Sequence, residues 1–155
     1  MKRKSDGKPA MTDKRLRVAS VQMESVAGDK AINFIKMETF LEKAAQQSVK
    51  IVVFPECCIT GYWFIRNLNS TDLYNLAEPI PGGESSQRLI ALSQKFQMTI
   101  GAGLVERAGK DCYHNSYIVA MPTGELRCHR KLQAFEHPLV RSGSEYTVFD
   151  TPHGI

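Results

Sequence analysis

Apolar positions in the first third of the chain follow the period of a strand and then that of a helix. Residues 16–23 alternate between two sets of side chains, which predicts a strand. From Lys30 the apolar residues recur every three or four positions, which predicts an amphipathic helix with Gly28 and Asp29 as its turn and N-cap. The helical stripe consists of Phe34, Met37, Leu41 and Ala44, widened by Phe40 and Ala45.

A short, β-branched apolar run at residues 51–54 follows this helix. Such a run is typical of a strand buried on both faces, in the middle of a layered α/β domain. Pro55 then ends the strand, because proline has no N–H to donate to a neighbour. Strand, helix and strand of these lengths predict a βαβ unit, in which the crossover joins two parallel strands.

The rest of the chain changes from helix-separated strands to hairpins. A short helix through Leu76 precedes a Pro- and Gly-rich break at residues 79–83, and Ser85 or Ser86 can cap the next helix. Strands are predicted at residues 98–105, 113–121 and 126–130, joined by turns, so the sheet should be mixed. Residues 131–145 predict a long loop of the kind that is usually functional, and residues 146–149 predict one more strand.

Two glycines in the strand at residues 98–105 also carry information. Gly101 and Gly103 lack a side chain in the interior of a strand, where glycine is otherwise unfavourable. We therefore expect another backbone or a substrate to approach the strand closely at these two positions.

Composition fits one globular domain. The chain has 155 residues, of which 43% are hydrophobic and 23% are charged. No apolar run approaches the length of a membrane span, and no apolar segment follows the basic N-terminus as it would in a secretory signal. We therefore expect no membrane partner and a cytoplasmic location.

Positive charge is concentrated at the N-terminus. The net charge of +4 divides into +5 for residues 1–17 and −1 for the remainder. A nearly neutral body argues against a nucleic-acid partner. Residues 1–15 are interpreted as a basic, disordered leader, with a nuclear-localisation patch as the alternative, and residues 16–155 as the folded domain.

The four cysteines give no sign of a metal centre. Cys57, Cys58, Cys112 and Cys128 show no CxxC spacing and no paired histidines, so neither a metal nor another cofactor is predicted. Adjacent Cys57 and Cys58 are poor disulfide partners, which favours a reducing compartment. The simplest interpretation of all four is a small buried hydrophobic side chain.

Two charged residues directly follow predicted strands. Glu56 comes after residues 51–54, at the carboxyl end where open α/β sheets place their chemistry. Tyr62, Trp63 and Phe64 can form the wall of a pocket in which a carboxylate accepts a proton. Lys131 follows residues 126–130 in the same manner. Taken alone, each residue is also compatible with an ordinary solvated charge.

Together these positions resemble a known family. Val53-Phe54-Pro55-Glu56 followed by Ile59-Thr60-Gly61-Tyr62 is similar to the base-bearing motif of the nitrilase, or carbon–nitrogen hydrolase, superfamily. The segment His129-Arg130-Lys131-Leu132 resembles the lysine motif of that family, and residues 115–124 resemble the hairpin before it. The resemblance keeps the family's order from residue 16 to residue 155.

The resemblance implies a fold, a reaction and a site. The fold is α/β, a nitrilase-like α-β-β-α sandwich in which helices cover a mixed sheet, incomplete in this chain. The reaction is hydrolysis of a non-peptide amide or nitrile substrate by a Glu-Lys-Cys triad, in a family whose members often form homo-oligomers. Glu56 is then the general base and Lys131 the oxyanion stabiliser. Glu136 is the best match for a second acid after the lysine, with Glu145 as the alternative.

The nucleophilic cysteine of the family has no counterpart among these residues. It follows a further strand, after the positions that match residues 146–154. The chain is therefore interpreted as the N-terminal half of such an enzyme and is expected to be inactive alone, unless Cys57 or Cys58 replaces the missing thiol. Two alternatives remain: a non-catalytic binding or assembly protein on the same fold, and an unrelated α/β small-molecule binder.

Overall fold

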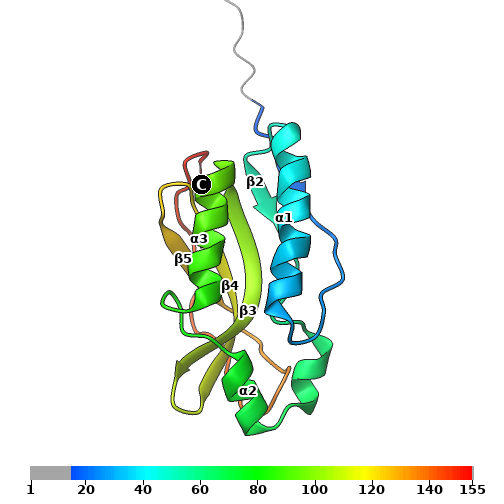
Figure 1. Cartoon of the computed structure of the whole chain (residues 1–155). Coiled ribbons are helices and arrows are strands. Elements are labelled where there is room, and N and C mark those ends of the chain that lie inside the picture. The colour runs from blue at the N-terminus through cyan, green and yellow to red at the C-terminus, as the bar shows by residue number, and fades with distance from the viewer. Residues whose placement is uncertain (1–14, 155) are drawn as a thin grey trace, which may run out of the picture.

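A mixed sheet of five strands forms the centre of the computed structural model, which describes residues 15–154 (Figure 1). The first three strands are parallel, and the last two continue the sheet as antiparallel hairpins, so the order in space equals the order in the chain. This confirms the predicted βαβ unit and the mixed sheet. The strands are β1 (Val18–Ser20), β2 (Ile51–Val53), β3 (Thr99–Gly109), β4 (Cys112–Ala120) and β5 (Leu126–Arg130).

Two long helices, α1 (Lys30–Gln46) and α3 (Glu84–Phe96), lie side by side against one face of this sheet (Figure 1). As predicted, Asp29 caps α1, its side chain accepting a hydrogen bond from the Ile32 N–H at 2.9 Å. Two short helices, η1 (Trp63–Asn67) and α2 (Ser70–Leu76), lie below them in Figure 1, at the end of the sheet where β2 finishes.

The main core fills the space between the helices and the sheet. The four predicted stripe residues of α1 are buried there with Leu89 and Leu92 of α3, although Ala45 is exposed. Strand residues of one parity face them, because successive side chains of a strand point to opposite faces. From the strands these are Val52, Ile100, Ala102, Leu104, Ile118 and Ala120.

The opposite face of the sheet is partly open, which corrects the expectation that residues 51–54 are buried on both sides. Val52 is fully buried, but Val53 is 39% exposed and Val18 is 62% exposed. The helices cover only one face of β1 and β2, so side chains of the other parity remain in contact with solvent. The apolar run therefore predicted the strand correctly, but it did not predict that one face of the strand is exposed to solvent.

Three predictions of local structure are also corrected. The first strand is only three residues long, and residues 146–149 form no strand, with Tyr146 and Val148 exposed. Gly83, and not a serine, caps α3. Ser85 lies inside that helix, where its N–H and hydroxyl both donate to the buried carboxylate of Glu78 at 2.7 and 2.8 Å.

Most of the basic leader lies outside the described residues, so its predicted disorder stays a prediction. Within the described part of the chain, no helix is long and apolar enough to cross a membrane.

Candidate active site

Glu56 is placed by the abrupt end of β2. The chain leaves the ladder after Val53 and passes over β3, where the Phe54 N–H still donates to the Gly101 carbonyl at 2.8 Å. A Cβ on Gly103 would lie 2.3 Å from the Cys57 nitrogen, so only glycine admits the turn that carries Glu56. Cys57 itself has a left-handed φ of +47°. The turn is closed by the Gly61 N–H, which donates to the Cys57 carbonyl at 2.7 Å.

Tyr117 of β4 holds the same strand end. Its hydroxyl donates to the Phe54 carbonyl at 2.8 Å, and its ring crosses Gly101, where a Cβ would lie 2.7 Å from the ring. The expected close approach of a backbone is thus confirmed at Gly103, whereas at Gly101 the approaching group is the side chain of Tyr117 rather than a backbone or a substrate.

Lys131 is held by the main chain on both sides. Its N–H donates to the Asn115 carbonyl and its carbonyl accepts from the Gly143 N–H, both at 2.8 Å. Arg130, one residue earlier, points to the opposite face of the sheet. The side chain of Lys131 therefore points to the face that α1 and α3 leave uncovered.

The structure brings Glu56, Lys131 and Glu136 into one cluster. The Lys131 ammonium donates to Glu56 Oε1 at 2.8 Å and also to Glu136 Oε1. The side-chain amide of Asn115 donates to the same two oxygens, at 2.5 Å for Glu56 and 2.8 Å for Glu136. The Tyr62 hydroxyl contacts Glu136 Oε1 at 3.5 Å.

A cavity of about 490 Å³ opens beside the cluster. Glu56, Lys131 and Asn115 line it together with Tyr117 and His129. Phe135 lies on the loop after Lys131, with its ring 4.5 Å from the ammonium, and the Tyr62 ring lies 5.7 Å away. A small substrate in this cavity would meet a carboxylate and an ammonium at one side and aromatic rings nearby.

Two opposing effects set the charges of the cluster. Burial disfavours the ammonium of Lys131, but its hydrogen bonds to Glu136 and Glu56 outweigh burial and raise the pKa of Lys131. Burial likewise opposes the charge of Glu136. The hydrogen bonds from Lys131, the main chain and Asn115 nevertheless hold the pKa of Glu136 below its ordinary value. Lys131 and Glu136 are therefore both charged at neutral pH.

The two thiols beside Glu56 are unreactive by environment. Cys57 and Cys58 are buried, and burial raises the pKa of both, to about 12 for Cys58. A thiol needs its thiolate form to act as a nucleophile. Cys112 and Cys128 are only partly buried, which corrects the expectation of four buried cysteines. Both lie in strands, at positions whose side chains point to the helix-covered face of the sheet.

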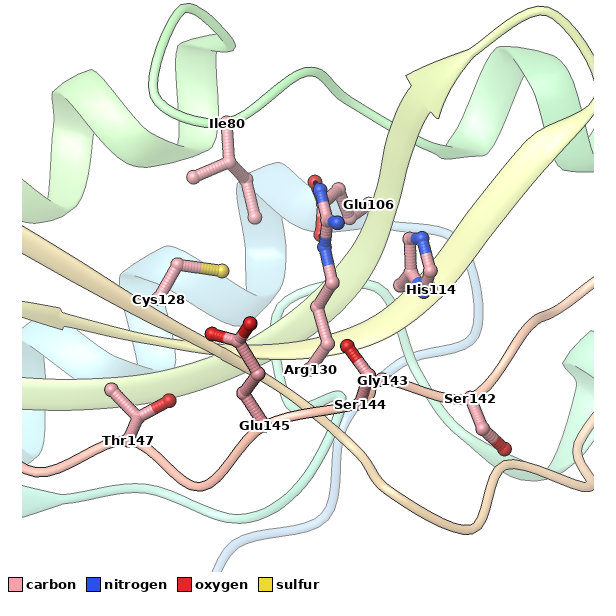
Figure 2. A pocket seen from close by; sticks show the side chains of 10 residues that line it. All are labelled: Ile80, Glu106, His114, Cys128, Arg130, Ser142, Gly143, Ser144, Glu145 and Thr147. Carbon is pink, nitrogen blue, oxygen red and sulfur yellow. Dashed lines mark hydrogen bonds and ion pairs between the residues drawn. The ribbon is translucent and has the colours of Figure 1, made fainter.

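A second cavity, of about 400 Å³, lies on the helix-covered side of β4 and β5 (Figure 2). Its lining includes Glu145, which places the alternative second acid away from Glu56 and Lys131 and leaves Glu136 as the acid of the cluster. The Arg130 guanidinium lies beside Glu106 in this view and donates to both of its carboxylate oxygens, at 2.8 and 2.5 Å. Among residues 15–154, no group of three or more His, Cys, Asp or Glu residues is arranged to hold a metal ion.

Sequence reasoning did not assign a function to Asn115 or Tyr117. Asn115 was noted only as part of a hairpin, and a lone amide in a strand gives no chemical signal of its own. Both residues could have been identified from the pairing of β4 with β3 and β5. It places Asn115 opposite Val105, next to the strand end that carries Lys131, and Tyr117 opposite Gly103.

Comparison with known proteins identifies the family of this chain. The model of the carbon-nitrogen hydrolase family matches residues 17–155. The chain is 32% identical over 120 residues to a nitrilase of Pyrococcus abyssi, covering 77% of this chain and 44% of that protein. It is 30% identical over 157 residues to the human omega-amidase NIT2, covering 92% of this chain and 52% of the relative. The chain thus spans about half the length of the curated relatives it matches.

Solved structures show the same fold. Nit3 of Saccharomyces cerevisiae, a member of the nitrilase superfamily, superposes with a TM-score of 0.74 at 30% identity, over 90% of this chain and 52% of that one. A CN-hydrolase superfamily protein of Xanthomonas campestris gives a TM-score of 0.74 at 22% identity, over 89% of this chain and 50% of that one. With the family model matched over nearly all of its length, this chain belongs to the carbon–nitrogen hydrolase family.

Proposed function

We propose that this chain supplies the general base and the oxyanion-stabilising cation of a carbon–nitrogen hydrolase that acts on a non-peptide amide or nitrile. The observation that carries the proposal is the contact of the Glu56 carboxylate with the Lys131 ammonium at 2.8 Å, beside a cavity that both residues line. A base and a cation at one wall of a cavity are the two groups that acyl transfer from nitrogen to a thiol requires.

The reaction on an amide needs two steps. In the first, Glu56 accepts the proton of a cysteine thiol while the sulfur attacks the carbonyl carbon, and Lys131 stabilises the negative charge on the oxygen. The C–N bond breaks and ammonia leaves with the proton that Glu56 held. In the second step Glu56 takes a proton from water, the hydroxide attacks the thioester, and the thiol returns with the acid as product.

Glu136 supports this chemistry without reacting. It is almost entirely buried and contacts the Lys131 ammonium directly. A second carboxylate on the same cation keeps Lys131 protonated and holds its side chain at the wall of the cavity. Glu56 shares the Lys131 ammonium with Glu136, so both carboxylates are held beside the cation that lines the cavity.

The nucleophile of this proposal is a cysteine outside residues 15–154. Of the four thiols in the chain, the two beside Glu56 are buried and protonated. The other two, Cys112 and Cys128, lie in strands at positions whose side chains point to the helix-covered face, away from Glu56. The relatives matched are about twice as long as this chain and carry the names nitrilase and omega-amidase, which supports a thiol supplied by a further segment and an amide or nitrile as the substrate class.

Ammonia release from a panel of simple amides and nitriles tests the proposal in a form of the protein that includes that cysteine. Glu56→Gln should lower kcat by about 100-fold or more, because the carboxamide keeps the shape but cannot take up a proton. Glu145→Gln is the matched control and should leave kcat unchanged, since Glu145 lines the other cavity.

Residues 1–155 alone should release no ammonia in the same assay. Intact-mass measurement would reveal an acyl adduct on Cys57 or Cys58 if one of these thiols served as the nucleophile. Unchanged kcat in Glu56→Gln, or such an adduct, would overturn the proposal.

A further inference from the structure

The side-chain amide of Asn115 occupies the centre of the acid cluster. Its nitrogen donates to Oε1 of Glu56 and to Oε1 of Glu136. The same two oxygens accept the hydrogen bonds of Lys131. Asn115 and Lys131 therefore close a ring in which two donors alternate with two carboxylate oxygens.

Charge alone does not explain why this ring is stable. Two carboxylates and one ammonium leave a net charge of −1 in a partly buried place, and the like charges repel. The amide supplies further N–H donors without adding charge, and hydrogen bonds to ionised groups are stronger than bonds between neutral ones. Within the described residues, Oε2 of Glu56 has no hydrogen-bond partner. The ring thus fixes Oε1 of Glu56 through two hydrogen bonds and leaves Oε2 without one.

The direction of the amide is set from its other side. Oδ1 of Asn115 accepts a hydrogen bond from the Cys57 thiol at 3.3 Å. If the amide were turned over, its oxygen would face two carboxylate oxygens. Cys57 can fill this role because it is buried beside Glu56 and remains a protonated thiol. The backbone of Asn115 is fixed by its place in β4 and by the N–H of Lys131.

We propose that Asn115 is a positioning residue that holds Glu56 and Glu136 in register with Lys131, and that the Cys57 thiol fixes which way its amide faces. The catalytic meaning of this arrangement rests on the proposed function. The arrangement itself can be measured in residues 1–155 without any turnover, so the failure of one proposal is distinguishable from the failure of the other.

An NMR titration of the chain tests the ring directly. The side-chain N–H₂ protons of Asn115 should exchange slowly with solvent, and their resonances should move as Glu136 titrates. Besides Asn115, the groups that face Glu136 are Lys131, Glu56, the Tyr62 hydroxyl and the Cys57 thiol. Amide protons that exchange as fast as those of an exposed asparagine would overturn the proposal, and this result needs no variant.

Asn115→Ala supplies the second readout. Removing the amide takes away one of the hydrogen bonds that keep the pKa of Glu136 low, so the midpoint of the Glu136 titration should rise. Ser116→Ala is the matched control, because Ser116 is the next residue of β4 and donates to Glu106 on the other face at 2.6 Å. An unchanged Glu136 midpoint in folded Asn115→Ala would show that the amide only fills space.

The thiol is tested by a pair of variants. Cys57→Ser keeps a donor and should preserve the slow exchange of the Asn115 amide, whereas Cys57→Ala should accelerate it about threefold or more. Equal exchange in both variants would remove Cys57 from the proposal. In an active form of the protein, Asn115→Ala should lower kcat about tenfold or more with little change in KM, as expected when a base is misaligned and binding is intact.

Discussion

Consecutive residues at the end of β5 build opposite kinds of site on the two faces of the sheet. Arg130 points to the helix-covered face and binds one buried carboxylate, Glu106, through two hydrogen bonds. Lys131 points to the open face and contacts two carboxylates, Glu56 and Glu136. The first pair is balanced in charge, whereas the second cluster carries an excess negative charge beside a cavity.

The neighbouring strand repeats the division. Ser116 donates a further hydrogen bond to Glu106, and Asn115, one residue earlier, donates to both acids of the open face. A fixed, charge-balanced fork is suited to holding strands together, because neither partner gains by moving a proton. On the open face, one lysine is shared by two acids beside a cavity. The comparison therefore favours a role in stability for the helix-covered face, and it places the proposed chemistry on the open face.

Replacing Lys131 should have the largest effect on activity. Lys131→Ala removes the cation that, in the proposed mechanism, faces the developing oxyanion, and loss of one such donor typically lowers kcat by roughly 100- to 1,000-fold. Kinetics in a form of the protein that contains the nucleophile would measure this effect. A kcat within about threefold of the wild-type value would show that the cluster of the open face is structural as well.

Replacing Arg130 should mainly affect stability. Arg130→Ala leaves the carboxylate of Glu106 buried, at 3% exposure, with only the Ser116 hydroxyl as a side-chain donor. Because the Arg130 side chain is itself partly exposed, the loss should be about 1–3 kcal/mol in the free energy of unfolding, the cost of leaving the buried carboxylate without its partner. Urea denaturation of residues 1–155 measures it, and Arg127→Ala, an exposed arginine of the same strand, is the control. A loss no larger than in the control would contradict the assignment.

Acid should lower the free energy of unfolding through a carboxyl group on each face of the sheet. Burial opposes the charges of Glu106 and Glu136, but their hydrogen bonds hold the pKa of each below its ordinary value. The unfolded chain therefore binds more protons at acidic pH, so the free energy of unfolding is greatest above about pH 5 and falls as the pH drops further. Denaturation curves between pH 7 and pH 3 would show this.

Single variants would separate the two contributions to this acid sensitivity. Glu106→Gln and Glu136→Gln should each flatten the dependence of stability on pH, because each removes one low-pKa group. If only one of these two variants flattened the pH dependence, ionised carboxylates would stabilise only one face of the sheet. That result would contradict the prediction that both faces contribute.

The smallest expected effect concerns the covering of the two faces. Val52 is fully buried under the helices, whereas Val53 is 39% exposed. Val52→Thr places a hydroxyl in an apolar environment and should cost about 1–3 kcal/mol, while Val53→Thr should stay within about 0.5 kcal/mol of the wild type. Thermal unfolding of residues 1–155 compares them. Equal losses would mean that the second face is also covered in solution.

The sequence determined the elements whose signal is local. The helical stripe of α1, its Asp29 cap, the bounds of β5 and the turns between the later strands follow from side-chain period and turn residues close together in the chain. The βαβ unit and the mixed sheet followed from the same information. The family motifs also selected Glu56, Lys131 and Glu136, whose side chains the structure brings together.

Only the tertiary structure decided how those residues are surrounded. The exposure of Val53 depends on which face the helices cover. Within residues 15–154, no strand pairs with residues 146–149, and pairing across strands is a property of the tertiary structure. The choice of Glu136 over Glu145, and the bridging amide of Asn115, arise from segments up to 59 residues apart in the chain. A local pattern fixes the period and the end of a strand, but a hydrogen bond across strands depends on register and packing, which no short stretch of sequence contains.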